Sequence, residues 1–191
     1  ETVRKSTLDA FSERFADVGF RREAFCFGYG LAEATLFVTG AGLCEENADR
    51  QLVTKQISMK HLQSDHVVAA TKTEIAEAAV TDLVGNGQPQ LDGQVMIVDV
   101  HSEQRLPDGA VGEVWVRGSH VAKGYWEKPK ETKEIFQAYL RDPDGQLSKN
   151  GPYLRTGDLG SLLEGSLFIT GREKDLMIIR GRNHYPQDVE H

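Results

Sequence analysis

The sequence predicts a mixed α/β fold, and two observations support that class. Near the start, Leu8, Phe11 and Phe15 recur at the spacing of one helical face. From about residue 80 onward, short apolar runs alternate with turns that contain glycine, which is typical of a small sheet or a distorted, barrel-like subdomain. The 191 residues could bury one full core or two small ones.

The first 40 residues are interpreted as the end of an α/β layer. Ser6 or Thr7 is expected to cap a helix that runs to about Val18, and Gly19 is expected to end it. A buried strand is then expected over residues 25–27, a glycine-bearing break at 28–30, one helical turn at 31–35 and an extended run at 36–38.

The segment between residues 40 and 80 has a less regular pattern. Residues 40–49 are acidic and loop-like, and residues 51–58 alternate weakly, with Val53 and Ile57 on one face, as in an edge strand. From 59 to 79 the pattern indicates only a short helix at 74–79.

The remainder is expected to consist of strands and turns around one helix. Pro129 is expected to open that helix, which continues to about residue 139. Val114 and Val116 should lie on one face of their strand and Trp115 on the other. The strands are expected at 94–100, 112–117, 159–163, 167–170 and 176–179, with turns at 106–109, 142–145 and 164–165 and a further helix starting at Pro186.

The composition argues against several classes of partner. A net charge of −7 disfavours nucleic acid or an anionic membrane as the main partner. No apolar run approaches the roughly 20 residues that a membrane-spanning helix needs. Cys26 and Cys44 lack the spacing of a disulfide framework, so we expect a reducing, cytoplasmic setting with Cys26 buried. His61 and His66 are poorly spaced for one helical face and are interpreted as surface residues, not ligands.

Two short segments near the end of the chain carry residues that suit a sugar diol. The segment Tyr153–Asp158 ends in an aspartate after a Thr-Gly turn, and Gly171–Asp175 brings Arg172 across a short hairpin. A carboxylate can accept from two hydroxyls at once, and a guanidinium offers donors in a planar fork. Taken singly, the two residues are more simply a turn aspartate and a surface arginine.

Four ordered blocks give these residues more weight. They are Gly28–Thr35 with Tyr-Gly-Leu-Ala-Glu, Gly112–Trp126, Tyr153–Asp158, and Gly171–Asp175 continued by Arg180–Asp188. In this order the blocks resemble the acyl-adenylate-forming superfamily, which includes acyl-CoA synthetases, luciferases and the adenylation domains of peptide synthetases. The first and last blocks resemble the fatty acyl-AMP ligases in particular. The resemblance covers nearly the whole chain and is weakest between residues 40 and 80.

The resemblance implies a ligase that activates a long-chain fatty acid with ATP to acyl-AMP. The acyl group would then pass to an acyl carrier protein of polyketide or lipopeptide biosynthesis. ATP or AMP and Mg²⁺ are the implied cofactors. Two alternatives stay open, namely an acyl-CoA synthetase and a non-catalytic interaction module that kept the scaffold.

The resemblance also implies roles for individual residues. Tyr29 would lie against the adenine, Glu33 would be the catalytic, Mg²⁺-associated carboxylate, and Lys174 would lie at a hinge between domains. Without the family, Tyr29 is equally a core tyrosine, Glu33 is by default a solvated helix glutamate, and Lys174 is just one charge in a polar turn. The implied nucleotide-binding set is Gly28, Tyr29, Gly30, Leu31, Ala32, Asp158 and Arg172, whereas Trp115, Tyr125 and Trp126 are interpreted as packing.

The sequence departs from many relatives at two positions. Ala32 stands where many carry a threonine whose hydroxyl meets the α-phosphate, although fatty acyl-AMP ligases share this alanine. The run Gly181-Arg182-Asn183 differs from the pattern of many CoA ligases, which weakens a CoA-binding interpretation. The stretch 34–111 also looks long, as in the acyl-AMP branch, whose extra segment is proposed to limit movement of the C-terminal domain.

We therefore expect three parts: residues 1–40 as the end of an α/β layer, residues 41–171 as the β-rich subdomain with an insertion at about 51–79, and residues 172–191 as the hinge and the start of a C-terminal domain. The family's phosphate loop and its catalytic lysine are not found in the sequence. We expect an internal piece of a longer enzyme, unable by itself to make acyl-adenylate.

Overall fold

The computed structural model describes residues 2–40, 53–90 and 92–185. Its helices are α1 (Lys5–Phe15), α2 (Met59–Leu62), α3 (Lys72–Ala76) and α4 (Pro129–Phe136), with 3-10 turns η1 (Ala16–Val18), η2 (Arg22–Ala24), η3 (Ala32–Ala34) and η4 (Glu173–Asp175). Its strands are β1 (Gly28–Tyr29), β2 (Thr39–Gly40), β3 (Thr54–Ser58), β4 (Val80–Val84), β5 (Gln88–Pro89), β6 (Gln94–Val98), β7 (Gly112–Arg117), β8 (Leu154–Leu163), β9 (Ser166–Arg172), β10 (Met177–Ile179) and β11 (Arg182–His184). The predicted mixed α/β class is confirmed, and barrel-like closure remains a prediction.

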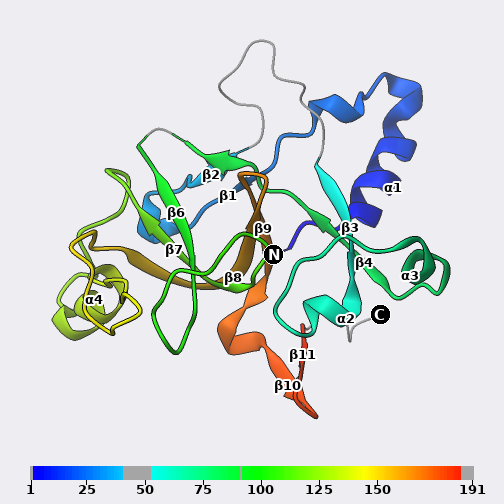
Figure 1. Ribbon diagram of the computed structural model, residues 1–191. Coiled ribbons are helices and arrows are strands. Elements are labelled where there is room, and N and C mark those ends of the chain that lie inside the picture. The colour runs from blue at the N-terminus through cyan, green and yellow to red at the C-terminus, as the bar shows by residue number, and fades with distance from the viewer. Residues whose placement is uncertain (1, 41–52, 91, 186–191) are drawn as a thin grey trace.

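Strands β6 to β9 form one antiparallel sheet in sequence order, around which the other described elements are arranged (Figure 1). Both faces of β7 are covered. Val114 and Val116 pack in a core cluster with Tyr29 and Val38 from the N-terminal segment. Trp115 packs on the opposite face with Tyr153, which confirms the predicted alternation.

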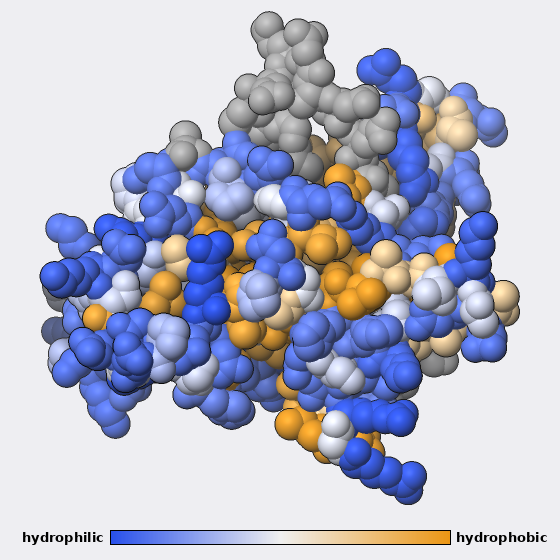
Figure 2. Space-filling model, in the orientation of Figure 1, coloured by the Kyte–Doolittle hydropathy of each residue, from blue (hydrophilic) through white to orange (hydrophobic). Residues whose placement is uncertain are grey.

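Three smaller sheets surround the central one, with strand orders β1-β2-β5, β3-β4 and β10-β11. A second core cluster joins the β3-β4 pair to the central sheet through Ile57, Leu83 and Phe168. Figure 2 shows apolar side chains among polar ones across the middle of one face and again at the β10-β11 hairpin. In that hairpin Ile178 and Ile179 are exposed.

The β10-β11 hairpin extends away from the end of β9 but is joined to the segment after α2 (Figure 1). The Asn183 side-chain amide donates to Asp65 Oδ1 at 2.6 Å, and the Asn183 backbone N–H donates to the Gln63 carbonyl at 3.2 Å. Tyr185 is buried in the second core cluster. A Cβ at Gly171 would lie 2.7 Å from the Tyr185 ring, so glycine is needed there.

The N-terminal helix differs from its prediction at its start and in its last turn, but not in the residue that ends it. It begins at Lys5, so Ser6 and Thr7 lie inside it, and Arg4 precedes it without a side-chain cap. Residues 16–18 form the 3-10 turn η1, and Gly19 ends the helical region with φ +85°, as predicted.

The predicted buried strand at residues 25–27 is wrong. Its short apolar run follows η2, and the strand β1 begins at Gly28. Cys26 is exposed, contrary to the expectation that it is buried. The extended run predicted at 36–38 also starts later, with β2 at Thr39, whereas the helical turn before it is observed as η3. The predicted positions of these strands came from local apolar composition. Their observed positions are determined by the hydrogen-bonded pairing between β1 and β2.

The middle segment is described from residue 53 onward. The weak edge strand is confirmed over Thr54–Ser58, where β3 pairs with β4. The short helix predicted at 74–79 lies earlier, at Lys72–Ala76, because Thr71 caps it through a reciprocal pair of hydrogen bonds with Glu74. The strand β4 and the helix α2 were not predicted from the sequence. The acidic loop at 41–49, Cys44 and the helix expected from Pro186 lie outside the described residues.

Strand β8 begins at Leu154, five residues before its predicted start, and contains a bulge. On β7, only Val114 separates Glu113 from Trp115, whereas on β8 residues 156–158 separate their partners Leu159 and Arg155. The bulge gives Gly157 a φ of +69°, which favours glycine. Thr156 Oγ1 donates to the Val114 carbonyl at 2.7 Å and accepts the Asp158 N–H at 3.1 Å. The extra residues thereby keep hydrogen-bond partners although they leave the ladder.

The carboxylate of Glu113, on the neighbouring strand β7, stabilises the same bulge. Glu113 is 2% exposed, and its Oε1 accepts the Gly157 N–H at 3.1 Å. Its Oε2 accepts from the Trp115 indole at 2.8 Å and from Arg155 at 2.8 and 3.0 Å. A buried carboxylate with this many donors is satisfied, and one that loses them is costly.

Substitution of Glu113 should therefore destabilise the chain more than substitution of a surface carboxylate. We expect Glu113→Gln to lower the free energy of unfolding by about 2 kcal/mol, because Arg155 and Gly157 lose a charged acceptor. Glu103→Gln, which removes a partly exposed ion pair with Arg141, should cost less than about 1 kcal/mol. Denaturant titration measures the free energy of unfolding of both variants. Equal losses in the two variants would contradict the role of Glu113 in stabilising the bulge.

The stability contributed by Glu74 should depend on pH. Hydrogen bonds from the Ser58 hydroxyl and then from Thr71 lower the pKa of Glu74 from 4.5 to about 2. A carboxyl with a lowered folded-state pKa stabilises above its unfolded pKa, and this contribution disappears as the pH falls toward the folded value. The stability difference between the wild type and Glu74→Gln should thus shrink between about pH 4.5 and 2, with exposed Glu77→Gln as control. A difference that does not change with pH would refute this.

Candidate functional site

The aspartate in the β8 bulge contacts two of the residues that the sequence singled out. The Tyr29 hydroxyl donates to Asp158 Oδ2 at 2.6 Å. Arg172, paired with Asp158 across β8 and β9, places its Nε 3.1 Å from Oδ1. The Asp158 side chain is 13% exposed and that of Arg172 57% exposed. Three residues from β1, β8 and β9 therefore meet at one carboxylate.

Tyr29 belongs to the core as well as to this cluster. The residue is 9% exposed and packs in the first core cluster, while its hydroxyl reaches Asp158. Burial, and then the charge of Asp158, raise the pKa of Tyr29 well above its usual value, so the phenol stays a donor. The contact of its ring with an adenine remains a prediction.

The glycines on either side of Tyr29 allow the chain to fold back closely. A Cβ at Gly30 would lie 1.6 Å from the Leu36 carbonyl oxygen, and one at Gly28 would lie 2.8 Å from that of Thr39. Glycine is required at both positions for a geometric reason, namely the close approach of β1 and the segment that leads into β2.

Glu33 lies on η3, the turn that follows β1, and is half-buried. Its Oε1 accepts a hydrogen bond from the Tyr125 hydroxyl at 2.6 Å. This hydrogen bond, together with burial and the charge of Glu33, raises the pKa of Tyr125 to about 12. Glu33 is bonded to Tyr125, whereas Asp158 is bonded to Tyr29 and Arg172, so the predicted site residues form two hydrogen-bonded groups.

Two cavities lie along the segment that carries these residues. The larger, about 360 Å³, is lined by Leu31 and Glu33 and also by Gly157 and Glu173, which are the chain neighbours of Asp158 and Arg172. The smaller, about 250 Å³, is bordered by residues 28–30. One cavity therefore follows the other along residues 28–33.

The two cavities differ in chemistry. Four carboxylates line the larger one, from Glu33, Glu113, Glu134 and Glu173, with Arg155 as the cation in the lining. The smaller is lined mainly by apolar or sulfur-bearing side chains, those of Cys26, Phe27, Leu36 and Phe37 beside Tyr29. An acidic cavity suits a ligand that brings cations, and an apolar one suits a hydrocarbon.

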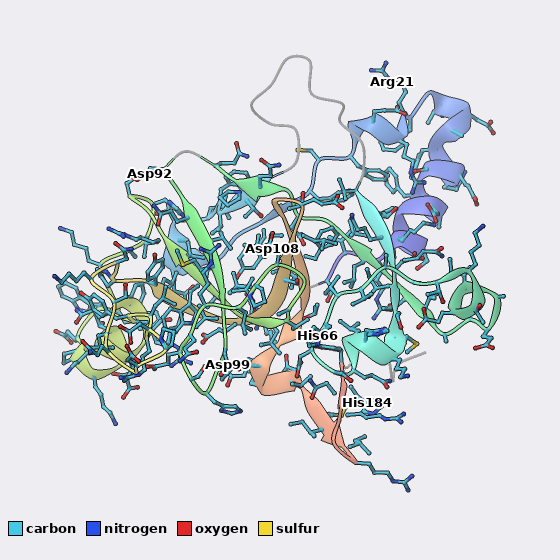
Figure 3. The ribbon with its side chains drawn as sticks, viewed as in Figure 1. Arg21, His66, Asp92, Asp99, Asp108 and His184 are labelled. Atoms are coloured by element: carbon cyan, nitrogen blue, oxygen red, sulfur yellow. The ribbon has the colours of Figure 1, made fainter. Side chains whose placement is uncertain are left out.

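The other two predicted residues, Ala32 and Lys174, lie close in sequence to Glu33 and Arg172. Ala32 is exposed on η3 and offers no hydroxyl, and Lys174 is exposed on η4, two residues after Arg172. In residues 2–40, 53–90 and 92–185, no group of three or more histidine, cysteine or acidic side chains is arranged to hold a metal ion. His66 and His184, labelled in Figure 3, come from the turn after α2 and from β11.

Three further residues belong to this site but were not predicted from the sequence. Tyr125 was interpreted as packing, and Glu113 and Arg155 received no role, although each lies inside one of the four blocks. The available signal was a glutamate placed between Gly112 and the apolar run Val114-Trp115-Val116, because an unpaired buried carboxylate would be unfavourable. No local pattern links Tyr125 to Glu33, since the contact spans 92 residues.

Comparison with known proteins identifies the family. The AMP-binding enzyme family matches residues 1–126. The chain is 40% identical over 190 residues to the long-chain-fatty-acid–AMP ligase FadD26 of Mycobacterium tuberculosis, covering 100% of this chain and 31% of that protein. It is 41% identical over 190 residues to the medium-chain-fatty-acid–[acyl-carrier-protein] ligase JamA of Moorena producens, covering 100% of this chain and 30% of that protein.

A solved structure agrees with these relatives. The fatty acyl-adenylate ligase from Legionella pneumophila, in complex with acyl adenylate and pyrophosphate, matches with a TM-score of 0.76 and 40% identity, over 100% of this chain and 31% of that one. The chain thus spans about 31% of the length of such relatives. No helix in the described ranges is long and apolar enough to cross a membrane.

These matches confirm the resemblance that the four blocks predicted. The relatives are fatty acyl-AMP ligases, and they match the chain from end to end. With the family match over residues 1–126, the chain belongs to the family of AMP-binding enzymes.

Proposed function

We propose that this chain forms the nucleotide-binding part of a cytoplasmic ligase that activates a long-chain fatty acid with ATP. A carboxylate oxygen of the fatty acid attacks the α-phosphorus, the bond to the bridging oxygen of the β-phosphate breaks, and pyrophosphate leaves. The acyl group of acyl-AMP then passes to the thiol of an acyl carrier protein in polyketide or lipopeptide biosynthesis, with release of AMP.

The observation that carries this proposal is the meeting of Tyr29, Asp158 and Arg172 beside the two cavities. In this proposal the Asp158 carboxylate accepts from the ribose hydroxyls, because its two oxygens offer about four lone-pair sites and the observed contacts fill only some of them. Arg172 adds donors at the exposed edge of the site. The adenine would lie against the segment 28–30 that holds Tyr29.

The charge of the larger cavity supports a role for Mg²⁺. A triphosphate is repelled by the surrounding carboxylates unless cations accompany it. Mg²⁺ is commonly held by one or two carboxylates, phosphate oxygens and water, and the single carboxylate of Glu33 fits that pattern. The described residues do not fit an all-protein metal cage. When bound, the ion would neutralise charge that develops on the phosphates.

The smaller cavity supports a fatty acid as the substrate. Its Phe27, Leu36 and Phe37 side chains provide apolar surface directly beside the proposed adenylate site. Burial of each methylene contributes about 0.8 kcal/mol, which favours a hydrocarbon chain over a polar acid. The matched relatives, one of them named as an acyl-carrier-protein ligase, support the same substrate class and acceptor.

We also propose the division of the chain into the three parts expected from the sequence, with Lys174 at the hinge. The hairpin beyond η4 is joined to residues 63–65 through Asn183 and to the second core cluster through Tyr185. Residues 63–65 lie within the proposed insertion at 51–79. These contacts suit a segment that restrains movement of a C-terminal domain.

Asp158 provides the most direct test of the ribose assignment. We expect Asp158→Asn to weaken adenosine binding by roughly tenfold or more, because hydrogen bonds to a charged acceptor are lost. Wild type should prefer adenosine to 2′,3′-dideoxyadenosine, and the variant should bind both alike. Calorimetric titration measures this, with exposed Asp108→Asn, labelled in Figure 3, as the control. An undiminished preference in Asp158→Asn would exclude the assignment.

The acidic cavity generates a second prediction. Without a divalent cation, the chain should bind adenosine more tightly than ATP, because the phosphates meet carboxylates. Mg²⁺ should improve ATP binding and leave adenosine binding unchanged. Fluorescence or calorimetric titrations in chelator and in Mg²⁺ check this order.

We further expect the chain alone to release no pyrophosphate from ATP and a fatty acid. The cation in the cavity lining, Arg155, forms an ion pair with Glu113 and is therefore not available to bind the phosphates.

Tight ATP binding in chelator would contradict the proposed electrostatic repulsion between the phosphates and the acidic cavity. Transfer to CoA in place of a carrier protein, by a longer active enzyme, would point to an acyl-CoA synthetase.

A further inference from the structure

The connection between β7 and α4 makes three hydrogen bonds to the short segment that carries Glu33. The Thr35 hydroxyl donates to the His120 carbonyl at 2.7 Å. The Ala122 N–H donates to the Glu33 carbonyl at 2.8 Å, and the Tyr125 hydroxyl donates to Glu33 Oε1 at 2.6 Å. One loop therefore contacts the Glu33 segment through its backbone, at His120 and Ala122, and through the side chain of Tyr125.

The segment needs such support because its own backbone is strained. Thr35 ends η3 with φ +66° and ψ −47°. A β-branched residue at positive φ is a steric outlier, and such conformations persist only where surrounding contacts impose them. The hydrogen bond to His120 fixes the strained residue from the side of the loop. The turn is thus held by its neighbours rather than by its own propensity.

Tyr125 is itself fixed before it reaches Glu33. Its N–H donates to Thr132 Oγ1 at 2.9 Å, and its ring packs edge-on against Phe136 with centroids 5.0 Å apart. Gly124, with φ +144°, lets the chain approach Thr132, whose side chain lies 2.2 Å from where a Cβ would be. Both partners belong to α4, so the helix sets the direction of the phenol.

We propose that Tyr125 is a positioning residue that directs the Glu33 carboxylate into the acidic cavity. The hydrogen bond occupies Oε1 and leaves Oε2 without a hydrogen-bond partner among the described residues. Both Tyr125 and Glu33 line the cavity, so a hard cation that enters with a nucleotide would meet an oxygen already oriented. The inference rests on the proposed function and adds a residue that acts through Glu33.

The alternative is that Tyr125 has a purely structural role and only packs against α4. Packing would survive Tyr125→Phe, because the ring and its contact with Phe136 remain. A positioning role would not survive, because only the hydroxyl reaches Glu33. The conservative variant therefore separates the two interpretations.

The test compares the ATP dissociation constant in chelator with that in Mg²⁺ for each variant of the whole chain. The ratio of these constants is the advantage that the cation gives. In Tyr125→Phe this ratio should fall by roughly three- to tenfold, the effect of one lost hydrogen bond. The AMP dissociation constant in chelator should stay at the wild-type value. Tyr139→Phe, a matched loss of a hydroxyl elsewhere, should change neither quantity.

A double-mutant cycle shows whether Tyr125 acts through Glu33. Glu33→Gln should remove the cation advantage, and adding Tyr125→Phe to it should change nothing more. The inference is overturned if Tyr125→Phe keeps the full ratio, if it weakens AMP binding equally, or if the two substitutions act additively. A wild-type chain that binds no adenine nucleotide would overturn the proposed function, and this inference with it.

Discussion

The candidate site depends on a bulge in β8 that a buried glutamate holds in place. Residues 156–158 face a single residue of β7, so they cannot all continue the ladder. Glu113 accepts the freed Gly157 N–H, and Thr156 satisfies the next backbone group from its own hydroxyl. The bulge can persist because these groups are paired, and it aims Asp158 at Tyr29 and Arg172 rather than along the sheet. The regular part of the sheet is the scaffold, and the bulge in β8 positions the Asp158 side chain within the site.

The site also separates two kinds of surface along one short segment. Residues 28–30 border an apolar cavity, and Leu31 with Glu33 borders an acidic one. The proposed product, a fatty acyl adenylate, joins a hydrocarbon to a charged nucleotide, and the two neighbouring cavities differ in the same way. The acidic cavity does not match a bare triphosphate. Its carboxylates make the proposed chemistry depend on cations that the lining does not supply, and this gives Glu33 its importance.

Local patterns predicted the β-rich part of the chain well and its N-terminal part less well. The alternation in Gly112–Arg117 and the Glu164-Gly165 turn between β8 and β9 were sufficient to predict that strand and that hairpin, but not the first five residues of β8, where the bulge lies. The strand predicted at Phe25–Phe27 was wrong because three apolar residues in a row resemble a short strand. The strand that forms instead begins at Gly28, which pairs with Gly40, and no local pattern reveals that pairing. The pairing of Asp158 with Arg172 followed from hairpin spacing. The contacts of Tyr29 and Tyr125 span 129 and 92 residues and could be found only from the fold.

Tyr29 on β1, Asp158 on β8 and Arg172 on β9 are proposed to surround one AMP moiety. A two-dimensional NMR titration of the isotope-labelled chain with AMP measures this most directly. We expect the backbone amides of Gly30, Gly157, Asp158 and Arg172 to shift together along one saturation curve, while those of the exposed strand β10 stay unchanged. Shifts confined to other surfaces, or separate curves for Gly30 and for Asp158, would contradict it.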